Sequence, residues 1–167
     1  MLVLASFVLL STKTTKTTKN FTQLPCDADL SLLSLPPLPE EPNKQFENGT
    51  RFYGSFNQNN KLTGKGILEF PNGNRYDGEF KNGKRTGCGR YSYLQKDSPY
   101  EYYIGQYVKD QPNGVGRLRW KNGNEYRGNF KDSKCEGEGI FQSASGSSKS
   151  GVWKKGDLLK DKNISCN

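Results

Sequence analysis

A short phrase recurs along this chain at a nearly constant interval, and a repeat of this kind fixes the architecture before any other feature does. Each copy has an aromatic residue, any residue and a glycine, then a second aromatic residue two positions on, and later a Gly-x-Gly triplet. The clearest copy starts at Tyr126-Arg127-Gly128 and ends with the triplet at 137–139. The second aromatic residue stands at positions 56, 80, 107, 130 and 153, so the unit is 23 residues long with small insertions.

The composition of each unit predicts a β-hairpin. Glycine is too frequent for a helix, where each one costs about 1 kcal/mol relative to alanine, whereas aromatic residues at alternate positions favour a half-buried strand. Asn82-Gly83 is a typical two-residue hairpin turn, and a hairpin centred there pairs Gly78 with Gly87. Each glycine then leaves room for a ring on the neighbouring strand. The equivalent predicted pairs are Gly105 with Gly114 and Gly128 with Gly137.

The links between units predict which side chains share a face. A three-residue loop at 72–74 pairs Phe70 with Tyr76 and keeps the rings together, because side chains alternate strictly along a strand. The predicted aromatic face carries Leu68, Phe70, Tyr76, Phe80, Tyr91 and Tyr93, and the opposite face carries Glu69, Asp77, Glu79, Arg90 and Ser92. The sequence therefore predicts an all-β fold, a single-layer antiparallel β-meander of stacked hairpins with an extended N-terminal tail.

The residues also carry a family resemblance. Tyr-Asp-Gly-Glu-Phe-Lys-Asn at 76–82, followed by Gly83 and a Gly-x-Gly triplet at 87–89, resembles the MORN repeat. The resemblance covers about residues 51–156, in four copies and a degenerate fifth at 151–153. It implies a scaffold, because MORN proteins are commonly scaffolds at membranes and in the cytoskeleton, including cilia. Binding to anionic, phosphoinositide-type lipid has also been proposed for the family.

Three further segments flank the repeat domain, which we place at 51–156. Residues 1–23 are an apolar and Thr/Lys-rich leader, too short in its apolar run to span a bilayer, which fits a signal or targeting segment, a shallow anchor or a docking terminus. Residues 24–50 are a Pro/Leu-rich linker, either a spacer or a segment whose leucines cover the aromatic face or bind a partner. Residues 157–167 are a basic tail.

Two questions about the compartment stay open at this level. The repeats favour a cytoplasmic protein associated with a membrane or the cytoskeleton, whereas cleavage of the leader at 1–23 would make it secreted or organellar. Three Asn-x-Ser/Thr triplets, which begin at Asn20, Asn48 and Asn163, are acceptor sequences for glycosylation in the second case.

The residues that enzymes and metal sites use are largely missing. The chain has no histidine, the commonest general base and a common metal ligand. Its four cysteines show no close-pair zinc spacing. Cys88 and Cys135 lie two units apart, about 19 Å in such a sheet and beyond disulfide reach of roughly 7 Å, whereas a bond between Cys26 and Cys166 stays open. We therefore predict no catalytic, cofactor or metal site and a protein that is not an enzyme.

The predicted function is that of a non-catalytic scaffold or interaction module, whose aromatic and glycine face meets another protein or a second copy of itself. The predicted partner-binding residues are Tyr76, Phe80, Tyr103, Tyr107, Tyr126 and Phe130. The alternative is peripheral binding to anionic membrane lipid, because the chain carries a net charge of +8. Its predicted residues are Arg117, Arg119, Lys121, Lys154, Lys155 and Lys160. Base stacking of single-stranded nucleic acid is disfavoured, since rings wedged beside glycines are not free to stack.

Overall fold

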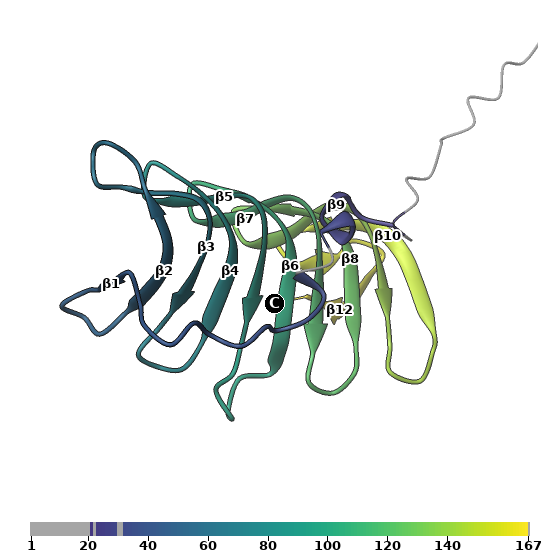
Figure 1. Ribbon diagram of the computed structural model, residues 1–167. Coiled ribbons are helices and arrows are strands. Elements are labelled where there is room, and N and C mark those ends of the chain that lie inside the picture. The colour runs from purple at the N-terminus through teal and green to yellow at the C-terminus, as the bar shows by residue number, and fades with distance from the viewer. Residues whose placement is uncertain (1–20, 22, 30–31, 167) are drawn as a thin grey trace, which may run out of the picture.

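The computed structural model describes residues 21, 23–29 and 32–166. Most of the predicted leader at 1–23, including the acceptor Asn20, lies outside these residues. The described chain forms one antiparallel sheet of twelve strands, in which the spatial order of the strands is their order in the sequence (Figure 1). A short 3-10 helix, η1 (Pro25–Ala28), precedes the sheet. The predicted fold class is confirmed.

The strands are short and regularly spaced. In chain order they are β1 (Lys44–Gln45), β2 (Arg51–Phe56), β3 (Leu62–Glu69), β4 (Arg75–Lys81), β5 (Lys84–Ser92), β6 (Tyr100–Val108), β7 (Gln111–Trp120), β8 (Glu125–Lys131), β9 (Lys134–Gln142), β10 (Ser148–Lys154), β11 (Asp157–Leu158) and β12 (Asp161–Ser165). Because the sheet is a meander, alternate connections lie at opposite ends of the strands (Figure 1). We call the end with the β4–β5, β6–β7, β8–β9 and β10–β11 turns the turn edge, and the other end the loop edge.

The four hairpins of the turn edge reverse on two residues that both have positive φ, which is the geometry of a type I′ turn. The corners are Asn82-Gly83, Lys109-Asp110, Asp132-Ser133 and Lys155-Gly156. The right-handed twist of the strands favours this turn type. The predicted corner at Asn82-Gly83 is therefore confirmed.

The predicted glycine pairing is wrong, because a β-bulge follows the turn. Lys81 faces Lys84 as a two-residue turn requires, but Gly78 then faces Gly89 and not Gly87. Gly87 takes up the extra length with φ +57. The bulge is stabilised by the Glu79 carboxylate, which accepts the backbone N–H of Cys88 at 3.0 Å. In the other two hairpins the partners are Gly105 with Gly116 and Gly128 with Gly139.

The link between units keeps the predicted loop length but not the predicted register. Leu68 faces Tyr76, so the three-residue loop is 71–73 and lies one step nearer the N-terminus than predicted. Gly73 takes φ +83 there, and the backbone N–H of Phe70 donates to the Asn74 carbonyl at 2.9 Å. The shift is an even number of residues, and the rings therefore still share one face. The predicted aromatic face is confirmed.

One row of glycines crosses the sheet from β2 to β10. Its members, each facing the next, are Gly54, Gly66, Gly78, Gly89, Gly105, Gly116, Gly128, Gly139 and Gly151. The ring of Tyr126 lies flat over one such pair, so closely that a Cβ added at Gly139 would come within 2.3 Å of the Tyr126 hydroxyl oxygen. That hydroxyl donates to the Asn129 carbonyl at 3.1 Å. Tyr76 and Tyr103 make the same two contacts in their hairpins.

The rings on this face connect neighbouring hairpins. Tyr126 meets Phe130 of its own hairpin edge-on, with ring centroids 5.3 Å apart, and meets Trp153 of the next hairpin at 5.0 Å. Tyr103 contacts Phe130 in the same way at 4.9 Å. Each edge-to-face pair contributes about 0.5–1.5 kcal/mol beyond the area that it buries. The degenerate fifth copy thus still supplies a glycine and a ring to the row.

Two disulfides use all four cysteines. Cys26 is bonded to Cys88, with Cα atoms 5.4 Å apart, and Cys135 to Cys166, with Cα atoms 6.2 Å apart. The alternative of a Cys26–Cys166 bond is therefore wrong, and the separation of Cys88 from Cys135 is confirmed. The second bond holds the end of the chain against the aromatic face, where Cys166 is buried. The segment predicted as a basic tail thus adds β11 and β12 to the sheet.

The first disulfide fastens the N-terminal segment to the face opposite the rings. We call residues 23–29 and 32–39 the strap, which crosses the sheet strands in Figure 1. Leu32 packs there with Cys26 and Ile104. Arg90 donates to the Leu32 and Leu33 carbonyls, both at 3.1 Å, and these bonds replace the water that the strap backbone gives up. The alternative that this linker covers the aromatic face is therefore wrong.

Because the Tyr126 ring packs on Gly139, we expect the effects of substitutions at these two positions on the unfolding free energy to be strongly coupled. Gly139→Ala is expected to cost about 1–3 kcal/mol of unfolding free energy, because the added methyl displaces the ring. In that background Tyr126→Leu should cost at least about 1 kcal/mol less than in the wild type. Urea unfolding of the four proteins in this double-mutant cycle measures the coupling.

The control for this cycle is Gly146→Ala, at a glycine that has open space around its Cβ position and, unlike Gly139, a positive φ. Its effect should add to that of Tyr126→Leu within about 0.5 kcal/mol. If the effects of Gly139→Ala and Tyr126→Leu on the unfolding free energy were also additive, that result would contradict the packing of the Tyr126 ring on Gly139.

The disulfide pairing predicts two cross-linked peptides after proteolysis without reduction, one with Cys26 and Cys88 and one with Cys135 and Cys166, both readable by mass spectrometry. Replacing Cys135 and Cys166 together by serine should lower the unfolding free energy by up to about 4 kcal/mol, since the open chain gains conformational entropy when unfolded. A peptide joining Cys26 to Cys166, or free thiols in the folded protein, would contradict the pairing.

Candidate functional site

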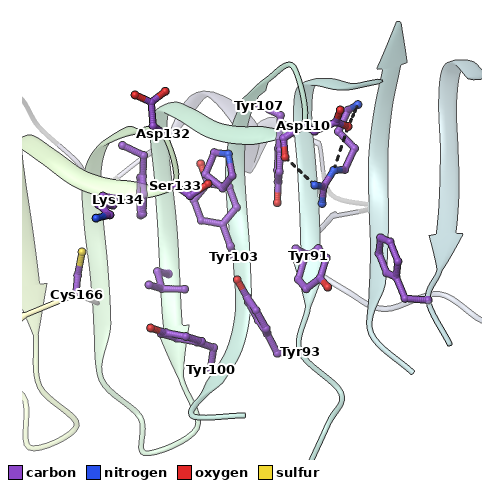
Figure 2. Close-up of a pocket in the computed structure, with 15 residues that line it drawn as sticks. Tyr91, Tyr93, Tyr100, Tyr103, Tyr107, Asp110, Asp132, Ser133, Lys134 and Cys166 are labelled. Carbon is purple, nitrogen blue, oxygen red and sulfur yellow. Dashed lines mark hydrogen bonds and ion pairs between the residues drawn. The ribbon is translucent and has the colours of Figure 1, made fainter. Parts of the chain in front are cut away.

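A groove of about 600 Å³ lies on the aromatic face. Rings from neighbouring strands line one part of it, among them Tyr91, Tyr93 and Tyr100, while the turn residues Asp110 and Asp132 lie at the other end (Figure 2). The groove thus combines an apolar floor with a charged rim, the usual composition of a binding site for a side chain or a small molecule.

The six predicted partner-binding residues are all at most 5% exposed. Three of them, Tyr103, Tyr107 and Phe130, line the groove. The other three, Tyr76, Phe80 and Tyr126, pack beneath neighbouring rings or beside glycines. The structure therefore brings half of the predicted set to the groove, and a role in binding a partner stays a prediction for all six.

Several groove residues were absent from the predicted set. Phe70, Tyr91, Tyr93 and Tyr100 line the groove and are only partly buried, so they are more accessible than the predicted rings. Tyr91 and Tyr93 had been assigned to the correct face, but nothing in the repeat pattern separates a ring in the glycine row from one nearer a strand end.

Arg85 fixes a positive charge at the groove wall. Its guanidinium carbon lies 5.5 Å from the ring centroids of Tyr76 and Tyr107 and 5.8 Å from that of Tyr91, within the range of cation–π attraction. The guanidinium also donates to the Asp110 carbonyl at 2.7 Å. Its Nε also lies 3.5 Å from the Asp110 carboxylate, so the guanidinium is held in place by rings, carbonyl and carboxylate and can offer its remaining N–H groups to a carboxylate or a peptide carbonyl in the groove.

Three buried tyrosine hydroxyls of the groove, those of Tyr93, Tyr103 and Tyr107, remain protonated at neutral pH. Burial, with smaller contributions from the neighbouring Tyr91 and Tyr100, raises the pKa of Tyr93 to about 12. Burial likewise raises the pKa of Tyr103 and that of Tyr107 well above 10. These hydroxyls therefore act as hydrogen-bond donors and are poor bases at neutral pH.

The structure does not bring the six predicted lipid-binding residues together. Arg117 pairs with Asp27 of the strap at 3.2 Å, and Arg119 pairs with Glu101 and Glu125 at 3.8 and 3.7 Å. Lys121 lies on the loop edge, where its ammonium donates to the Lys96 carbonyl at 3.2 Å. The other three, Lys154, Lys155 and Lys160, are exposed near the last hairpin. Their role as lipid-binding residues stays a prediction.

Two further properties bear on the chemistry of the chain. Across residues 21, 23–29 and 32–166, no group of three or more cysteine, aspartate or glutamate residues is placed to hold a metal ion. In the same part of the chain, no helix has both the length and the apolar character needed to cross a bilayer.

The buried tyrosines predict that stability falls at alkaline pH. A tyrosine whose folded pKa lies above its unfolded value of about 10 stabilises the fold below pH 10, and this contribution is lost as the pH rises towards the folded pKa. Urea unfolding should show constant stability between about pH 8 and 9 and a steep loss between about pH 10 and 12. Tyr93→Phe should reduce that slope, and an unchanged slope would contradict the burial of this hydroxyl.

Comparison with protein-family models gives four matches to one family, the MORN repeat, at residues 52–75, 76–94, 103–125 and 126–148. Together they cover more than half of the 167 residues. The last three matches begin at or close to the first residue of β4, β6 and β8, so each contains one hairpin of the turn edge. No curated protein matches the chain significantly.

Proposed function

Because the chain belongs to the MORN repeat family, we propose that it is a non-catalytic scaffold whose aromatic face binds a protein partner. MORN repeats are generally interaction or membrane-binding modules. The protein partner is either a different protein or a second copy of this chain.

One observation supports this proposal, which is that the two faces of the sheet are covered to different extents by the rest of the chain. The strap occupies the face opposite the rings, where Cys26, Arg90 and Arg75 hold it by a disulfide and by hydrogen bonds. Within the part of the chain that the structure describes, the C-terminal segment packs on the aromatic face, and a ring-lined groove remains open beside Cys166. Since partly exposed aromatic residues supply much of the free energy of protein association, the open groove is the better candidate for a partner.

The groove suggests the chemistry of the partner. Tyr93 and Tyr100 offer apolar ring surface with hydroxyl donors, and Arg85 offers a fixed cation. An extended peptide segment with one apolar side chain and an adjacent carboxylate or backbone carbonyl would satisfy all three groups. The same features argue against catalysis, because the chain has no histidine and the groove hydroxyls are held protonated by burial.

Peripheral binding to anionic membrane lipid is the second candidate function. It is supported by the exposed lysines near the last hairpin, Lys154, Lys155 and Lys160. Each lysine close to an anionic membrane contributes about 1 kcal/mol. The two functions differ in their response to salt, since charge-driven binding weakens steeply as salt rises and binding by buried rings does not.

Selection of a displayed random-peptide library on the folded protein tests the scaffold function. Peptides that bind the wild type should lose at least about tenfold in affinity when Tyr93 and Tyr100 are both replaced by serine, because about 1.4 kcal/mol or more of ring contact is removed. Raising the salt to about 0.5 M should change their affinity little.

Val108→Ser with Val152→Ser is the matched control, since both valines are exposed and lie outside the groove. This control should bind the selected peptides like the wild type. Equal loss in the two double variants, or binding that disappears at high salt, would favour surface charge over the aromatic face.

A further inference from the structure

The turn edge carries a row of lysines. Every type I′ turn has at least one lysine at a corner or directly beside it, and all of these side chains are exposed. In order along the sheet they are Lys81 and Lys84, then Lys109, then Lys131 and Lys134, then Lys154 and Lys155. The acids in the same four turns are Asp110, Asp132 and Asp157, so the row has a clear positive excess.

The loop edge does not share this charge. Its four loops from β3–β4 to β9–β10 contain Lys96 and Lys121 against Asp97, and two of the loops contain no charged residue at all. The positive charge is therefore concentrated on one edge, and a general excess of lysine in the composition does not explain it. We call the seven lysines of the four turns the lysine row.

Hydrogen bonds between hairpins hold the lysine row in line. The backbone N–H of Asp110 donates to the Arg85 carbonyl at 3.1 Å, and that of Ser133 donates to the Pro112 carbonyl at 3.0 Å. Gly156 makes the same bond to Cys135 at 3.0 Å. Each turn is thus fixed to the hairpin before it, and successive turns follow at two strand spacings, about 10 Å. The turns that carry the row are therefore held in a fixed order over a distance of about 30 Å.

A hollow between the last two turns provides a place where an anion can be held. It measures about 440 Å³ and is lined by the four lysines of these turns together with Asp132 and Glu136. The four lysines outnumber the two carboxylates, so the lining carries a net positive charge that raises the local concentration of anions. A ligand with anionic groups at regular intervals could occupy the hollow and continue along the row.

The two disulfides limit which classes of anionic ligand the protein can meet. Disulfides that use every cysteine of a chain form and persist in oxidising compartments, which favours the secreted or organellar alternative over the cytoplasm. The anionic membrane leaflet faces the cytoplasm and is out of reach from there. The four turn corners carry no aromatic residue on which a nucleic-acid base could stack. Acidic polysaccharides are the linear polyanions that an exported protein meets.

We propose that the lysine row binds a linear acidic polysaccharide through its sulfate or carboxylate groups. The row has the right form for this ligand, because a line of evenly spaced ammonium groups matches a chain that carries anions along its length. Lysine suits flexible contacts of this kind, since its ammonium is a point charge that needs no fixed bidentate geometry. The row adjoins the aromatic groove at the third turn, where Asp132 and Lys134 line both the hollow and the groove, but it does not depend on the protein partner proposed above.

The test uses the full oxidised chain with immobilised heparin as the sulfated probe, polygalacturonate as the carboxylated probe and phosphatidylserine vesicles as the competing class of ligand. Replacing Lys81, Lys109, Lys131 and Lys154 by glutamine, none of which lines the aromatic groove, should weaken polysaccharide binding at least about tenfold near 0.15 M salt. The control replaces Lys44, Lys96, Lys121 and Lys149 by glutamine, which removes the same charge and should weaken binding less than about threefold.

Binding to either polysaccharide that depends on the lysine row supports the proposal. Equal losses in the two quadruple variants would overturn it, because net charge alone would then explain the binding. Retention by vesicles but by neither polysaccharide, or no binding near 0.15 M salt, would overturn it as well. The lysine-row variant should keep the peptide binding of the aromatic face, so failure of this proposal and failure of the scaffold function can be told apart.

Discussion

The contact on which this structure depends is the flat packing of tyrosine rings on glycine backbone. Tyr76, Tyr103 and Tyr126 each cover two facing glycines, and each hydroxyl donates to a backbone carbonyl of its own strand. A ring in this position fills the space that a second layer of secondary structure fills in most domains. The sheet can therefore bury side chains from a single layer, and each hairpin needs only its neighbours, as in other repeat proteins.

The two glycines of each Gly-x-Gly triplet have different tasks, which explains what the sequence could and could not predict. Gly89 lies under the Tyr76 ring, whereas Gly87 has positive φ in the bulge. Two glycines separated by one residue look equivalent in the sequence and point to the same face, so the faces and the meander were predictable but the register was not. The deciding group is the Glu79 side chain that accepts the Cys88 N–H in the bulge. Gln106 makes the equivalent bond to Val115 in the next hairpin, but neither bond can be read from the spacing of the glycines.

The strap was harder to predict than the sheet because its contacts come from outside the repeat. Position 77 and its equivalents 104 and 127 hold aspartate, isoleucine and arginine, which looked like free variation on an exposed face. In the structure Ile104 packs on Leu32, while Asp77 forms a buried pair with Arg75, whose guanidinium also bonds the strap at Pro36. The residue at this position therefore differs from copy to copy because different segments pack against different units. The disulfide pairing was unpredictable for the same reason.

The position of the strap and the distribution of charge divide the molecular surface into regions that we expect to bind different ligands. The strap covers part of the face opposite the rings and cannot leave it while Cys26 is bonded to Cys88. Binding by ring contact is then confined to the aromatic face, where the groove lies. The lysine row stands at the ends of the hairpins and its ammonium groups extend from exposed turn residues, so a ligand there need not enter the groove. A scaffold that joins a protein to an anionic polymer would require two such surfaces, and the meander can provide them because the turns follow one another along the sheet edge, parallel to the glycine row and displaced from it.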